Sequence, residues 1–176
     1  MKLISYYFHV YKNFLSSSLS MELSFRTNFI LLIFMDIFFY SSTLFTADFM
    51  FNHMDHLGLW NRDQLLFFLS FMLVVDSIHM TLMSANFWVL ARDLKTGHLD
   101  YALLKPTHII FNIFFRQLRP SSFITFFLAL SVLLHFGLKL KLDPTQWLLL
   151  PPLILISLTL KALIEMAISS TMFWTT

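Results

Sequence analysis

Six ionisable side chains interrupt long apolar stretches of this sequence, and their positions make them the first candidates for chemistry. They are Asp36, Asp76, His79, His135, Lys161 and Glu165. In a helix that crosses a membrane, a charge at the centre costs about 2.5 to 3.5 kcal/mol on insertion scales, so such residues are functional candidates by default. Each of them needs a partner or a wet cavity.

Two pairs of these residues have a spacing that lets them satisfy each other. Lys161 and Glu165 are four positions apart on one helix face, so they can form an internal ion pair that helps the helix insert. Asp76 and His79 also share a face, and a hydrogen bond between them is expected. Asp36 has no local partner, so we expect it to face another helix or a wet cavity, where it could line a substrate path.

No carboxylate pair and no Ser-His-Asp set can be distinguished by spacing. The sequence has no cysteine, which excludes disulfides and thiolate metal sites. It also has no phosphate-binding loop of the form G-x-x-x-x-G-K-[ST], since its three glycines stand at positions 58, 97 and 137. We therefore expect no catalytic site, no metal site and no ATPase site in this chain.

Histidine supports one alternative, because imidazoles on different helices of a membrane bundle can ligate haem b and carry electrons. His79 and His135 are the two histidines that lie well inside apolar stretches. In the topology derived below, His79 lies near mid-membrane and His135 near the outer end, so their depths match poorly. The haem interpretation is therefore the weaker one.

The composition favours lipid as the solvent for most of the chain. Of 176 residues, 57% are hydrophobic, 18% aromatic and 12% charged, and the mean hydropathy is +0.71. A water-soluble domain normally carries roughly twice that charged fraction. The alternating rhythm of a transmembrane barrel is not visible. We therefore predict an all-α integral membrane bundle, with a start that lacks the features of a removable signal peptide.

Four stretches are long and apolar enough to cross the roughly 30 Å hydrocarbon layer as helices. We place these spans at residues 28–50, 65–90, 121–138 and 147–172. The third is short. The sequence predicts one transmembrane domain over residues 1–176, with the region 91–120 as a loop between the second and third spans.

An amphipathic helix is predicted before the first span, within residues 1–27. Aromatic and aliphatic side chains recur there at helical spacing, which is typical of a helix lying in the membrane interface. A frayed polar terminus is the alternative. Ser16, Ser17 and Ser18 are expected to mark a bend into the membrane. The stripe consists of Tyr6, Tyr7, Val10, Tyr11, Phe14 and Leu15.

The distribution of lysine and arginine sets the orientation. Three such residues precede or begin the first span and five lie in the loop 91–120, whereas three lie on the opposite side. The positive-inside rule then places the N-terminus and this loop in the cytoplasm. The eight cytoplasmic residues are Lys2, Lys12, Arg26, Arg92, Lys95, Lys105, Arg116 and Arg119; the three outer ones are Arg62, Lys139 and Lys141.

The loop 91–120 is neither a polar linker nor a span. Gly97 permits a turn at positive φ, and Pro106 ends any helix that precedes it. Between them, leucines and a tyrosine predict a short amphipathic element along the membrane surface. The apolar run from Ile109 to Phe115 predicts a second helix in the membrane plane.

The segment NFWVLARDLKTGHLDYALLKP resembles the signature of a family of six-span bacterial ABC exporter permeases of the ABC-2 type. In that family a basic residue, a glycine, Leu-Asp, two leucines, a basic residue and a proline follow a helix end. Weaker agreements are Leu59, Trp60 and Gln64, and Phe173, Trp174 and Thr175. The signature places are filled here by Lys95, Gly97, Leu99, Asp100, Leu103, Leu104, Lys105 and Pro106.

This resemblance implies a permease subunit of the bacterial inner membrane that works with a cytoplasmic ABC ATPase and a second permease chain, identical or different. The region from Arg92 to Pro106 would be the coupling loop that docks on the ATPase, which would bind ATP and Mg²⁺. Without the resemblance, Gly97 and Pro106 would be read as helix ends and Asp100 as a solvated turn carboxylate. Transport out of the cell is likewise an implication of the family.

The chain departs from the family in length, since members usually continue for two more spans after the Phe-Trp-Thr position. The resemblance therefore implies the first four spans of a permease. A separate polypeptide could supply the rest, or the product could be an inactive truncated permease. A structural or assembly subunit of the membrane is a further alternative, which a neighbouring ATPase gene would disfavour.

Overall fold

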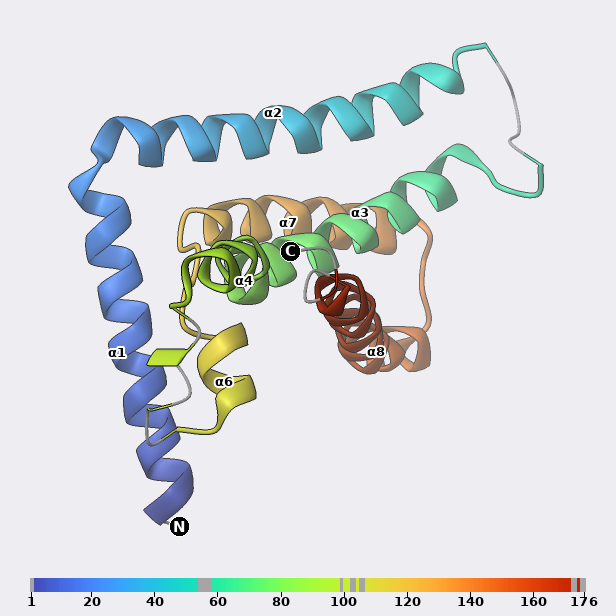
Figure 1. Ribbon diagram of the computed structural model, residues 1–176. Helices are drawn as coiled ribbons and strands as arrows, with labels where there is room; N and C mark the ends of the chain where they lie inside the picture. The colour runs from blue at the N-terminus through green and yellow to red at the C-terminus, as the bar shows by residue number, and fades with distance from the viewer. Residues whose placement is uncertain are drawn as a thin grey trace. The chain divides into compact units, whose positions relative to one another are not determined.

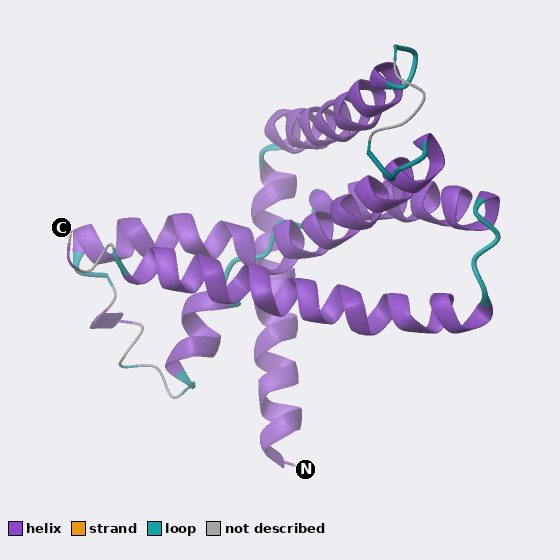
Figure 2. Cartoon of the chain, turned by 90° about the vertical axis from the view of Figure 1, so that its right-hand side faces the viewer, coloured by secondary structure: helices purple, strands orange, loops and turns teal. Residues whose placement is uncertain are grey.

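The computed structural model describes residues 2–53, 58–98, 100, 101, 104, 107–171 and 174. Over these residues the regular structure is helical and contains no strand (Figure 2). The prediction of an all-α chain is confirmed.

Within the described residues, four long helices are apolar enough to cross a membrane, in agreement with the predicted count. They are α2 (Arg26–Met50), the continuous run from Arg62 to Thr96, α7 (Ser122–Lys139) and α8 (Pro144–Ser170). The run from Arg62 to Thr96 consists of α3 (Arg62–His79), the π-helical turn η1 (Met80–Ser84) and α4 (Ala85–Thr96). The second helix thus continues past its predicted end at residue 90.

The chain divides into two compact units, which are described separately. The core unit comprises Thr27–Ile78 and Ser121–Leu158. The loop unit comprises Met1–Arg26, His79–Pro120 and Thr159–Thr176.

The centre of the core unit lies where α2, α3 and α7 meet. Tyr40 of α2, Val74 of α3 and Ala129 of α7 are buried there together with Leu73 and Leu133. Ala129 has no exposed surface, and its small side chain lets α3 and α7 run side by side (Figure 1). These side chains form one contiguous apolar cluster.

Ion pairs join the helices of the core unit at one end. Arg62 at the start of α3 contacts Asp48 near the end of α2. Lys139 Nζ, at the end of α7, lies 2.7 Å from Asp63 Oδ1 in the first turn of α3. Both pairs are partly exposed, so each contributes at most about 1 kcal/mol.

The outer surfaces of α2 and α8 are strongly apolar. Exposed side chains include Phe34 and Phe38 on α2, and Leu155 and Ile164 on α8. Lipid tails or helices of another membrane chain cover such surfaces at no cost to hydrogen bonding. This distribution fits a protein whose apolar residues face a membrane as well as a core.

A helix occupies the N-terminal region, as predicted. This helix, α1 (Lys2–Ser24), is continuous, and its half-buried residues include Tyr7, Tyr11 and Phe14. The expected bend at Ser16–Ser18 is wrong: the chain turns at Phe25, whose amide donates to the carbonyl of Glu22. Ser18 lies within α1, and its hydroxyl accepts a hydrogen bond from the Leu118 amide.

The loop between the second and third spans begins at Gly97. Gly97 has φ +70°, the left-handed conformation in which glycine commonly ends a helix, and it terminates α4. A short helix, α6 (Ile109–Phe114), follows where the apolar run predicted one. Arg92, Asp93 and Lys95 therefore belong to the last turns of α4 and not to an irregular loop.

Candidate functional site

A segment without regular secondary structure, residues 117–119, leads from α6 towards α7. Its three consecutive backbone amides donate to three different elements. Gln117 donates to Asn86 Oδ1 of α4 at 2.8 Å, and Leu118 donates to Ser18 Oγ of α1 at 3.1 Å. Arg119 donates to the carbonyl of Thr81 in η1 at 3.0 Å. The segment is therefore fixed along its whole backbone.

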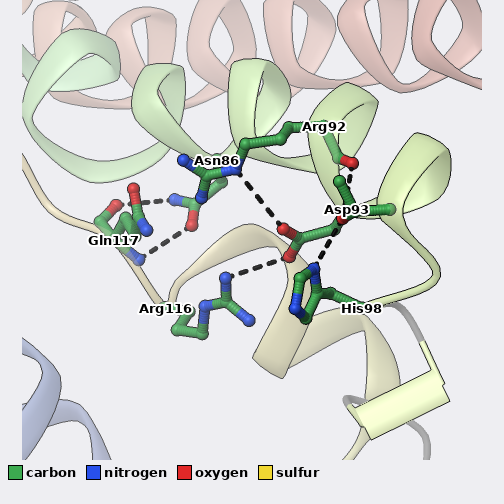
Figure 3. A network of polar contacts seen from close by, with 7 residues as sticks. Asn86, Arg92, Asp93, His98, Arg116 and Gln117 are labelled. Atoms are coloured by element: carbon green, nitrogen blue, oxygen red, sulfur yellow. Dashed lines mark hydrogen bonds and ion pairs between the residues drawn. The ribbon is translucent and has the colours of Figure 1, made fainter.

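Asn86 is the central residue of this attachment. Besides accepting the bond from the Gln117 amide, its Nδ2 donates to the Gln117 carbonyl at 2.6 Å (Figure 3). An amide side chain thus pairs with both backbone groups of one residue, as a neighbouring strand would. Asn86 is 1% exposed, so removing either bond would leave a buried polar group unsatisfied.

A partly buried ion pair lies one to two turns further along α4. Arg116 donates to Asp93 Oδ2 at 3.0 Å, and Asp93 is 7% exposed (Figure 3). Arg92 Nε lies 3.8 Å from the other carboxylate oxygen of Asp93. A buried carboxylate without its cationic partner is strongly destabilising, so the Asp93–Arg116 contact fixes the relative position of α4 and the segment after α6.

The contacts of Asn86, Asp93, Ser18 and Thr81 with residues 116–119 form the base of the loop. Beyond this base, several described residues of the loop are exposed. Lys95, Gly97, Asp100 and Leu104 are exposed, Leu104 at 81%. Thr96 Oγ1 lies 2.6 Å from His98 Nδ1 and also donates to the Arg92 carbonyl, which tightens the turn around Gly97. Leu99, Leu103, Lys105 and Pro106, which the sequence assigned to the coupling loop, lie outside the described residues.

The inner face of α1 packs on α6, and the two helices lie side by side in Figure 1. The rings of Tyr7 and Phe14 lie 5.0 and 6.1 Å from the ring of Phe111. The Tyr7 hydroxyl accepts a hydrogen bond from the His108 amide at 3.0 Å. Burial raises the pKa of the Tyr11 phenol above its ordinary value.

The two aspartates within the spans of the core unit contact hydroxyl groups of other helices. The Ser122 hydroxyl of α7 donates to Asp36 Oδ2 at 3.1 Å. The Tyr40 hydroxyl of α2 donates to Asp76 Oδ2 at 3.1 Å. Asp36 thus faces another helix, as the sequence required. Asp76 has a partner from another span in addition to any local one.

The ionisable residues of the later spans are placed as follows. His79 is 2% exposed, and its Nε2 lies 2.9 Å from Glu165 Oε2 of α8. Glu165 therefore has a partner on a different helix. The ion pair that the sequence predicts between Glu165 and Lys161 stays a prediction, and Lys161 is half-buried. His135 is exposed, with its ring 5.2 Å from that of Phe136. In the part of the chain that the structure describes, no group of three or more metal-ligating side chains comes together.

Sequence reasoning missed the residues that hold the base of the loop. Asn86 carried a usable signal, because an amide inside the apolar run MSANFWVLA needs a partner. Ser18 and Thr81 carried none, since hydroxyl groups can bond to their own helix backbone. The backbone of residues 117–119 carries no sequence signal at all.

In the part of the chain that the structure describes, four helices able to cross a membrane define a multi-pass membrane protein. Residues 30–176 match the family model described as ABC-2 family transporter protein, so the chain belongs to this family. The match includes the loop and its signature residues, and it supports a membrane transporter permease. Comparisons with curated proteins and with solved structures gave no match.

Proposed function

We propose that this chain is the membrane-spanning permease component of an ATP-driven ABC exporter, and that the segment from Arg92 to Pro106 docks on a separate ATPase subunit. The ATPase subunit binds ATP and Mg²⁺. The permease has no ATPase site of its own and passes between inward-facing and outward-facing arrangements.

The anchored base of the loop is the observation that supports this proposal. A loop that passes on the movement of a partner must be fixed to the helices that it moves, because a slack connection would absorb the displacement. Asn86 and Asp93 fix the loop to α4, while Ser18 fixes it to α1. The exposed Lys95, Asp100 and Leu104 offer a basic, an acidic and an apolar contact beyond that base. A rigid base with an exposed tip is the arrangement that docking requires.

The charge distribution supports the location of this loop in the cytoplasm of a bacterial cell, with the permease in the inner membrane and its N-terminus also cytoplasmic. A second permease chain, identical or different, completes the transport path. The apolar surfaces of α2 and α8 are available for lipid and for that second chain.

The docking assignment is tested by co-expressing this chain with the ABC ATPases of the same organism and measuring which of them co-purifies with it. Gly97→Ala and Asp100→Asn should each lower the amount of ATPase recovered by at least tenfold, while the amount of permease in the membrane stays unchanged. Gly97→Ala acts by straining a left-handed residue, and Asp100→Asn acts by removing an exposed charge.

Gly58→Ala is the matched control. Gly58 also has a positive φ, of +64°, and at both glycines no atom lies within 4 Å of an added Cβ. The two substitutions therefore impose the same kind of strain, and they differ in the loop that carries it. Recovery of the ATPase at the wild-type level with Gly97→Ala and Asp100→Asn would show that the docking assignment is wrong. Equal losses with Gly58→Ala would show a general effect of strain.

A further inference from the structure

The second membrane helix is interrupted by a π-helical turn, η1, at Met80–Ser84. A π turn contains more residues per turn than an α-helix and occurs most often at functional sites. Each residue of an α-helix adds about 100° of rotation about the helix axis. One extra residue in a turn therefore changes the rotation of all the following helical residues by about 100°. Here the helix beyond η1 is α4, which carries Asn86 and Asp93 toward the base of the loop.

His79 stands directly before the π turn and is held by side chains from two other positions. Its Nε2 contacts Glu165 of α8 at 2.9 Å. Its ring is stacked at 21° on the ring of Phe87, with 6.3 Å between the centroids. Phe87 in turn lies 5.3 Å from Phe114 of α6. A side chain with 2% exposure and these neighbours has little freedom to move.

The π turn is also held from the loop. The carbonyl of Thr81, inside η1, accepts a hydrogen bond from the amide of Arg119. A break in the regular i→i−4 ladder makes helix carbonyls available to outside donors. The return segment of the loop thus bonds to η1 itself as well as to α4 through Asn86.

We propose that His79 and Glu165 are positioning residues that hold Met80–Ser84 in its π-helical form and so set the rotation of α4 and of the loop that it carries. Loss of the contact lets the turn relax to an α-helix, which rotates α4 by about 100° relative to His79. Asn86 and Asp93 then lose their alignment with residues 116 and 117. This effect of the His79–Glu165 contact on the rotation of α4 does not depend on the ATPase. Its effect on docking of the ATPase rests on the proposed function.

Electron paramagnetic resonance on the full chain in lipid nanodiscs tests this directly. The chain has no cysteine, so Lys95→Cys on α4 and Leu19→Cys on α1 give two unique labelling positions. Both side chains are exposed. A rotation of about 100° moves a label on the surface of α4 by on the order of 10 Å. His79→Leu and Glu165→Leu should each shift or broaden the measured distance between the two labels.

Variants that preserve or bypass the contact separate positioning from general loss of packing. His79→Gln keeps an N–H donor, so it should retain the wild-type distance. Leu163→Ala removes an exposed side chain from the same helix as Glu165 and should have no effect. Deleting Leu82 removes the extra residue of the π turn. In that background α4 should keep its rotation, and His79→Leu should no longer shift the distance.

Three outcomes would overturn the proposal: an unchanged distance with His79→Leu, the same shift with His79→Gln as with His79→Leu, or a full shift with His79→Leu in the Leu82 deletion. The measurement contains no ATPase. A chain that shows the expected shifts but fails to bind the ATPase therefore contradicts only the docking assignment.

Discussion

At the scale of single residues, the side chain of Asn86 supplies backbone hydrogen bonds that a neighbouring strand would otherwise supply. The segment 117–119 has no neighbouring strand, yet backbone groups away from water need partners. Asn86 supplies both a donor and an acceptor to Gln117, and Ser18 and Thr81 accept from the next two amides. Together these contacts fix a segment that has no regular structure of its own.

Asn86→Leu should loosen this segment without unfolding the spans. The substitution leaves the amide and the carbonyl of Gln117 without these partners, and each unsatisfied buried group costs about 1–3 kcal/mol. Hydrogen exchange of the amides of residues 117–119, followed by mass spectrometry in detergent, should accelerate at least tenfold. Asn61→Leu is the control, because Asn61 is exposed in the loop before α3. Unchanged exchange with Asn86→Leu would contradict the anchoring role.

At the scale of elements, the turn between α7 and α8 is set by one close contact. A Cβ added to Gly137 would lie 2.7 Å from Trp147 Cη2 and 3.3 Å from Phe67 Cε2. Glycine therefore lets the indole of α8 lie directly on the backbone of α7. Gly137 has an ordinary helical φ, so the requirement comes from space and not from backbone conformation.

Gly137→Ala should lower the thermal stability of the chain in detergent. Overpacking of this kind costs about 1–3 kcal/mol, because the ring of Trp147 must shift. A second substitution, Trp147→Phe, removes the larger ring system, so the double variant should recover part of the loss. The two changes should therefore be non-additive. Strictly additive losses would show that the two residues do not compete for the same space.

At the scale of the whole molecule, charge predicts the orientation in the membrane. The sequence carries eight lysines and arginines in the N-terminal segment and the loop 91–120, against three on the other side of the predicted spans. The positive-inside rule therefore predicts that the loop lies in the cytoplasm. Two of the three other cations, Arg62 and Lys139, form ion pairs with Asp48 and Asp63.

Single-cysteine labelling tests this orientation in intact cells. Lys95→Cys should react with a membrane-impermeant maleimide only after the cells are opened, whereas Lys141→Cys should react before. Both side chains are exposed, so accessibility within the protein does not bias the comparison. The reverse pattern would contradict the cytoplasmic placement of the loop and, with it, the docking proposal.

Some features could be predicted from the sequence because they depend on one segment at a time. The length and apolarity of each stretch determine the four membrane-crossing helices. Gly97 marks the end of α4 because few other residues adopt a positive φ at a helix end. The apolar run after Pro106 predicted the helix that the structure shows as α6. The ordered signature around Gly97 gave the family, which the match over residues 30–176 confirms.

Other features depend on which segments meet, and only the tertiary structure decided them. The sequence predicts for Glu165 only a partner on its own helix, Lys161, whereas the packing also brings it to His79. Three serines can end a helix or continue it, and the contact of Ser18 with Leu118 accompanies the continuous form. The π turn at Met80–Ser84 is likewise visible only in the structure, because no local sequence pattern predicts it. Local sequence determines where helices can form, whereas partner choice depends on interactions between helices that no local pattern contains.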